Sequence, residues 1–97
     1  MKLYAIRRPE AWATAEELSI AAERSRQVGD EEMPDRVRWI RSYVVLEADG
    51  SLGTICIYEA TTPEMIHEHA IRADLPATEI YEVVDTVVVR PDPVGVA

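Results

Sequence analysis

The chain has 97 residues, of which 47% are hydrophobic and 29% are charged, a composition typical of a single soluble globular domain. Eighteen acidic residues against ten basic ones give a formal net charge of −8, which repels a phosphate backbone and argues against nucleic acid as a partner. The single cysteine excludes an intramolecular disulfide, and no apolar run reaches the roughly 18 residues that a membrane span requires.

The amino-terminal sequence M-K-L-Y-A-I-R-R has an uninterrupted run of only four apolar residues before its arginines, too few for a signal peptide, so we expect a cytoplasmic protein. The segment Lys2–Arg8 predicts a first strand that ends at Pro9. Thr14 then begins a helix through a capping box with Glu17. We expect this helix to end at Gly29 and the acidic segment 30–35 to be a solvated loop.

A β-hairpin is predicted over residues 37–60, because Asp49-Gly50 lies between two alternating runs rich in β-forming residues. A two-residue turn at this position makes Val44 oppose Ile55. The sheet then has one face carrying Ile40, Ser42, Val44, Leu46, Ile55, Ile57 and Glu59, and a second face carrying Trp39, Arg41, Tyr43, Val45, Thr54, Cys56 and Tyr58. We expect the helices to cover the first face and the second, more aromatic face to remain open.

A second helix begins with Thr62 as its cap and Pro63 at its first position, and it should end by Asp74. The hydrophobic periodicity of residues 77–82 does not distinguish a helical turn from the start of a strand. The valine-rich run Val83–Arg90 predicts the last strand. We therefore expect one domain over residues 1–90, followed by a tail over residues 91–97.

The resulting order βαββαβ predicts an α+β, ferredoxin-like fold in which two helices cover one face of a four-stranded antiparallel sheet. The other face, with Trp39, Tyr43, Val45 and Tyr58, is too apolar to stay fully hydrated. We expect a homodimer in which the open sheet faces pack together, as in dimeric α+β barrels. Cys56, on the same face, is interpreted as part of that interface.

His69 is the first candidate for a functional side chain. Its spacing from Ile66 and Ala73 places it on the inward stripe of the second helix. The predicted register puts Glu59 on the face that this helix covers, where a carboxylate requires a partner, a proton or a metal.

Imidazole and carboxylate together suit divalent nickel, zinc or copper. We predict a metal site at His69 and Glu59, with further ligands from His67, Glu68, water or a second subunit. An internal pair of Glu59 and His69 is the alternative that the same residues allow.

The runs W-I-R-S-Y-V-V (39–45), G-T-I-C-I-Y-E-A (53–60) and E-H-A (68–70), with Leu75-Pro76, resemble a family of small bacterial proteins known through a nickel-binding member. The opening K-L-Y-A-I-R-R and the closing T-V-V-V-R-P-D-P extend the resemblance over nearly the whole chain. It implies a ferredoxin-like fold, a homodimer and a bound nickel(II) ion without established catalysis. His69 is the motif position that the resemblance favours as functional.

A competing interpretation follows from cofactor-independent monooxygenases and small isomerases of similar topology, whose pockets lie between helices and sheet. In such a pocket His69 would act as general base, Ser42 or a tyrosine would orient the substrate, and Arg41 or Arg72 would hold an anionic group. A dimeric interaction module without any site is a third possibility.

Overall fold

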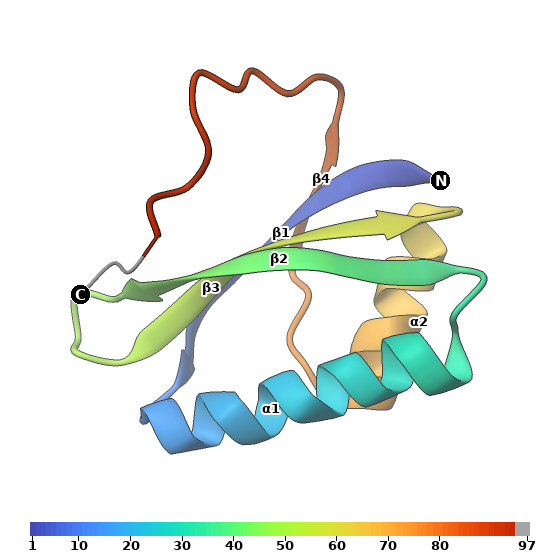
Figure 1. Ribbon diagram of the computed structural model, residues 1–97. Coiled ribbons are helices and arrows are strands. Elements are labelled where there is room, and N and C mark those ends of the chain that lie inside the picture. The colour runs from blue at the N-terminus through green and yellow to red at the C-terminus, as the bar shows by residue number, and fades with distance from the viewer. Residues whose placement is uncertain (95–97) are drawn as a thin grey trace.

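The computed structural model describes residues 1–94. Its elements are β1 (Lys2–Trp12), α1 (Ala15–Gln27), η1 (Val28–Glu32), β2 (Val37–Leu46), β3 (Leu52–Ala60), α2 (Pro63–Ala73) and β4 (Glu79–Val83). The four strands form one antiparallel sheet in the order β2-β3-β1-β4, and both helices lie on the same side of it (Figure 1). The predicted ferredoxin-like α+β fold is confirmed. No helix in residues 1–94 is long and apolar enough to cross a membrane.

The first strand is longer than predicted, because Pro9 does not end it. Pro9 lies where the register with β3 shifts, between Arg8 and Trp12, and Glu10 next to it has a positive φ of 50°. At such an irregularity the missing N–H of proline removes no ladder hydrogen bond. The chain can therefore resume pairing at Trp12, opposite Leu52.

Helix α1 begins as predicted but does not end as predicted. Thr14 Oγ1 accepts a hydrogen bond from the Glu17 amide at 3.2 Å, and the Glu17 carboxylate accepts one from the Ala13 amide at 2.9 Å. The chain continues past Gly29 in the π-helical turn η1, so the stop at Gly29 was wrong, and the predicted loop over 30–35 is irregular only from residue 33 on. The Met33 amide donates to the Val28 carbonyl at 3.0 Å, and this wide turn brings both side chains into the core.

The hairpin between β2 and β3 has a longer turn than predicted. The Gly50 amide donates to the Glu47 carbonyl, the Glu47 amide donates to the Ser51 carbonyl, and Gly50 has a φ of 88°. This is a three-residue connection with a glycine in the left-handed region, so Leu46 opposes Leu52 and Val44 opposes Thr54 instead of Ile55. A second irregularity at residue 40 shifts the register again, between Trp39 and Arg41.

The longer turn reverses the predicted faces of β3. Thr54, Cys56 and Tyr58 are buried on the helix-covered face, whereas Ile55 and Ile57 lie on the open face. A change of one residue in register moves every side chain of a strand to the opposite face relative to its neighbour. The expectation of a dimer-interface role for Cys56 was therefore wrong, because its side chain lies in the core cluster.

The last strand is also displaced from its predicted position. β4 is Glu79–Val83, and residues 84–94 are irregular, so the strand predicted over Val83–Arg90 was wrong. In the antiparallel pairing with β1, Val83 opposes Leu3. The pairing between β1 and β4 ends there, and the valine-rich run that follows lies in no strand. Residues 95–97 of the predicted tail lie outside the described part of the chain.

Candidate functional site

His69 lies inside the core, between α1, α2 and the sheet. Its side chain is 1% exposed, and its ring meets that of Tyr58 edge to face at a centroid distance of 5.1 Å. Nε2 lies 3.0 Å from the backbone carbonyl oxygen of Ser25. A carbonyl oxygen only accepts, so Nε2 carries the proton and donates it. The prediction that His69 faces inward is confirmed, and the nitrogen that contacts Ser25 is committed to that hydrogen bond.

The electrostatics around His69 favour the neutral ring. Burial lowers the pKa of His69 below its ordinary value of 6.5, although the hydrogen bond to the Ser25 carbonyl acts in the opposite direction. Tyr58 beside it donates to or accepts from Ser25 Oγ at 2.6 Å, and burial raises the pKa of its hydroxyl to about 12. Both rings are therefore uncharged near neutral pH, as expected of a polar network within a core.

Glu59 does not lie near His69. It opposes Leu3 on β1 and Arg38 on β2, on the sheet face that the helices leave open. Its neighbour in sequence, Tyr58, points to the covered face and contacts His69. Within one chain the structure therefore does not bring Glu59 and His69 together, either as a shared metal site or as an internal pair. The cause is the three-residue turn of the hairpin, which places Glu59 on the other side of the sheet.

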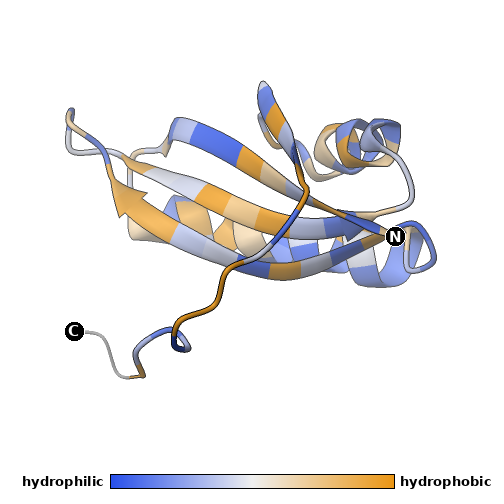
Figure 2. Ribbon diagram, turned by 90° about the horizontal axis from the view of Figure 1, so that it is seen from above, coloured by the Kyte–Doolittle hydropathy of each residue, from blue (hydrophilic) through white to orange (hydrophobic). Residues whose placement is uncertain are grey.

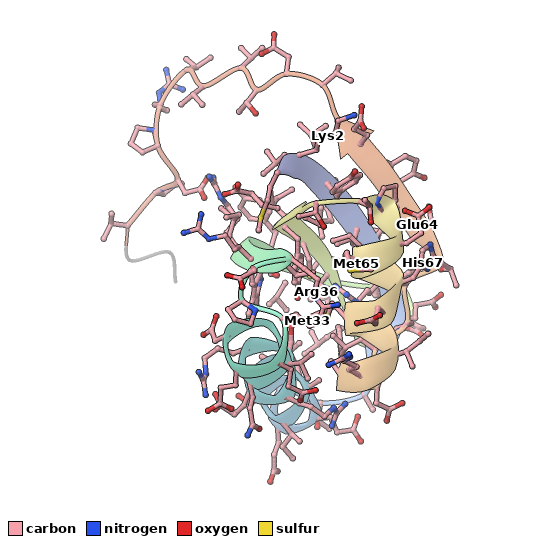
Figure 3. The ribbon with its side chains drawn as sticks, turned by 90° about the vertical axis from the view of Figure 1, so that its right-hand side faces the viewer. Lys2, Met33, Arg36, Glu64, Met65 and His67 are labelled. Carbon is pink, nitrogen blue, oxygen red and sulfur yellow. The ribbon has the colours of Figure 1, made fainter. Side chains whose placement is uncertain are left out.

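His67 and Glu68 lie on the outer part of α2. The imidazole of His67 is exposed, and Figure 3 shows it on the same side of the helix as Glu64. Glu68 accepts from Arg36 at 3.4 Å and forms an ion pair with Arg72 at 3.0 Å. Its carboxylate therefore links α2 to the start of β2, whereas His67 forms no hydrogen bond or ion pair within residues 1–94.

Residues 1–94 bring together no group of three or more histidine, cysteine, aspartate or glutamate side chains that could hold a metal ion. Of the four predicted metal ligands, a single chain therefore brings at most two together, and these lie on α2. Nickel and zinc sites in proteins use more ligands than this, so further donors would have to come from water or from a second molecule.

A cavity of about 410 Å³ does exist between α1 and the sheet, as the competing pocket hypothesis requires. Ser42 and Tyr58 line it, in agreement with that hypothesis. His69, Arg41 and Arg72 are not among its lining residues, and Arg41 lies on the open sheet face. The predicted combination of base and anion-binding group is therefore not assembled around this cavity.

The lining residue that the sequence analysis missed is Arg8. It follows Tyr4 and Ile6 in strict alternation on β1, and all three side chains are buried on the covered face. That alternation was a visible signal, since residues two apart in a strand share a face. Arg8 was predicted to be the last residue of the strand, directly before Pro9, and such a terminal position would be more exposed than the one it occupies.

Comparisons with known proteins add a family and a fold. A family model described as "Nickel responsive protein SCO4226-like" matches residues 4–83. The crystal structure of SCO4226 from Streptomyces coelicolor A3(2) resembles the present structure with a TM-score of 0.68 and 20% sequence identity, over 88% of this chain and 99% of that chain. At this identity the structural likeness is one of fold. No match was found among curated proteins.

Proposed function

This chain belongs to the SCO4226-like family of nickel-responsive proteins, and from that premise we propose that it binds nickel(II) as a homodimer. The observation that carries the proposal is the family match, which spans residues 4–83 and so includes all or nearly all of each helix and strand. The family is described as nickel-responsive, and we propose in addition that this chain binds the nickel ion itself.

The exposed imidazole of His67 supports a metal site on the outer face of α2. Glu64 precedes it by three residues, a spacing that places two side chains on the same helix face. Glu68 is a second-choice ligand, because it would have to give up its contacts with Arg36 and Arg72. Imidazole nitrogen with carboxylate and water oxygens is a donor set that nickel(II) accepts.

His69 and Glu59, the residues first proposed as ligands, have less support from the geometry. Only Nδ1 of His69 has a lone pair for a metal, because Nε2 carries the proton donated to the Ser25 carbonyl, and Glu59 lies on the opposite side of the sheet. We therefore propose His67 as the protein ligand that anchors the metal, with Glu64 and water as the sources of the remaining donors.

The open face of the sheet supports a second copy as partner. Four large hydrophobic side chains of the sheet are 38–57% exposed: Ile40, Tyr43, Ile55 and Tyr81. A patch of this kind on a small protein usually marks an interface. The face also carries both Arg38 and Glu59 in opposed positions, so two copies can match unlike charges.

The valine-rich segment after β4 extends the same argument. Val84, Val87, Val88 and Val89 are 71–89% exposed, and Figure 2 shows this hydrophobic run outside the sheet. The chain then returns to β2, where the Tyr43 hydroxyl donates to the Asp92 carboxylate at 2.9 Å. We propose that this arm packs on the second copy, which would remove its valines from water.

The test is calorimetric titration of metal-free, tag-free protein with nickel, zinc and copper, alongside the variant His67→Ala. We expect nickel to bind with a dissociation constant in the range of about 1 μM, and the substitution to weaken binding by at least about tenfold. Ile71→Ala is the matched control, since Ile71 is 79% exposed on the same helix and has no donor atom. This control should leave nickel binding unchanged.

Two results would count against the proposal. Weak binding that does not distinguish nickel from zinc would remove nickel as the ligand. Tight nickel binding that persists in His67→Ala would retain the metal but exclude His67 as the anchor.

A further inference from the structure

Arg8 is the most deeply buried charged side chain in residues 1–94. It is 1% exposed, and it is the largest of the fully buried side chains. No carboxylate of the described residues lies within ion-pair distance of its guanidinium, although five other arginines form such pairs. A guanidinium keeps its charge at any physiological pH, so this charge is buried without a counter-charge.

The contacts that Arg8 does make orient the guanidinium. Nε donates to the Pro76 carbonyl at 2.7 Å, and the guanidinium carbon lies 5.7 Å from the centre of the Tyr58 ring. A carbonyl and an aromatic ring stabilise a cation, but neither carries a full negative charge. Nη2 is buried and has no hydrogen-bond partner. Within residues 1–94 no other buried side-chain nitrogen or oxygen lacks a partner. Native structures rarely leave such a donor unpaired.

The unpaired guanidinium forms part of the wall of the 410 Å³ cavity between α1 and the sheet. This cavity exists because α1 presents small side chains to the sheet, among them Ala15, Ala21 and Ala22. The helix lies across the covered face (Figure 1), so the space that larger side chains would fill stays open. The volume is within the range of sites that bind small organic molecules.

The remaining wall is largely apolar and aromatic. Both tryptophans of the chain, Trp12 and Trp39, line the cavity, and so does the ring of Tyr58. Trp39 and Tyr58 stack with an interplanar angle of 8°, which provides a flat surface. Ser42 Oγ accepts the indole proton of Trp39 at 2.8 Å, so its own hydroxyl proton is available to a ligand oxygen.

We propose that this cavity binds a small monocarboxylate with a flat apolar body, and that Arg8 pairs with the carboxylate. Arg8 is the only charged residue in the lining, which matches a single negative charge better than a phosphate dianion. The aromatic wall matches the flat body. The site is separate from the proposed nickel site, since neither His67 nor Glu64 lines the cavity.

The test uses 2-naphthoate as the probe and its neutral carboxamide as the comparison ligand, with metal-free protein and a chelator present. Because both tryptophans line the cavity, intrinsic fluorescence reports binding directly. We expect 2-naphthoate to change the fluorescence with a dissociation constant below about 1 mM, and the carboxamide to bind at least about tenfold more weakly.

Arg8→Met removes the charge but keeps an extended apolar side chain at this buried position. It should abolish the preference for the acid over the carboxamide. The dissociation constant of the carboxamide should stay within about twofold of its wild-type value. If this variant does not fold, Ala22→Leu serves instead: it fills part of the cavity and should weaken both ligands. Equal affinity of wild-type protein for acid and carboxamide, or no fluorescence change with either ligand up to about 5 mM, would overturn the proposal.

Discussion

Replacing His69 by alanine separates a structural role from a ligand role for this residue. The substitution removes the hydrogen bond to the Ser25 carbonyl, worth about 1 kcal/mol. It also removes the edge-to-face contact with Tyr58, worth about 0.5–1.5 kcal/mol, and leaves a cavity in a region where the ring is 1% exposed. Together these losses predict a decrease of about 3 kcal/mol in the free energy of unfolding.

The assay is urea unfolding of metal-free protein at pH 7.5, followed by fluorescence at one fixed protein concentration. For a chain of 97 residues a loss of this size lowers the melting temperature by roughly 12–24 °C. The substitution should leave the nickel affinity of the folded protein unchanged, provided that titration is done well below the melting temperature. A conservative variant, His69→Gln, keeps a hydrogen-bond donor and should recover part of the lost stability.

The pH dependence gives a second readout of the same residue. Burial lowers the pKa of His69 in the folded protein below its unfolded value near 6.5, so the unfolded chain binds more protons in the interval between the two. The contribution of His69 to stability is therefore complete above pH 6.5 and is lost as the pH falls through the folded pKa. The difference in unfolding free energy between wild type and His69→Ala should thus decrease from pH 7.5 to pH 5.5.

The reasoning would be refuted if His69→Ala unfolded with a free energy within about 1 kcal/mol of wild type and no longer bound nickel. That result would make His69 a metal ligand whose hydrogen bond to Ser25 is incidental. A large loss of stability without a change in nickel affinity would assign the residue to the core.

Two further substitutions test the sheet. Gly53→Ala should destabilise the protein by about 2 kcal/mol in urea unfolding, because the added Cβ would lie 2.7 Å from the Arg8 carbonyl oxygen and closer still to the Glu47 carboxylate. An unchanged free energy of unfolding would mean that β1 and β3 can move apart at Gly53 at little energetic cost. Ile55→Arg on the open face should reduce the mass in sedimentation equilibrium to that of one 10.9 kDa chain. Ile20→Arg, on the exposed side of α1, should leave the mass unchanged, and a dimer that survives Ile55→Arg would exclude this face as the interface.

The sequence by itself determined the element order and most of the local signals. The Thr14 cap, the Pro63 start of α2 and the inward direction of His69 depend on contacts within one or two turns of helix, so a short window of sequence contains the physical information. Element order then limits a chain of this length to few topologies, and the ferredoxin-like sheet followed from it. Nickel as the metal, the homodimer and the cytoplasmic location remain predictions.

Tertiary structure decided which face each side chain of the sheet occupies and where the last strand ends. One extra residue in the turn at Gly50 placed Glu59 on the open face, a second irregularity at residue 40 placed Trp39 opposite Tyr58, and no local preference distinguishes these registers. The valines after Val83 have high strand propensity, but the pairing of β4 with β1 ends at Val83 opposite Leu3, and these valines lie in no strand. Strand pairing joins distant parts of the chain, so its outcome depends on where the partner strand begins and on which face the helices bury.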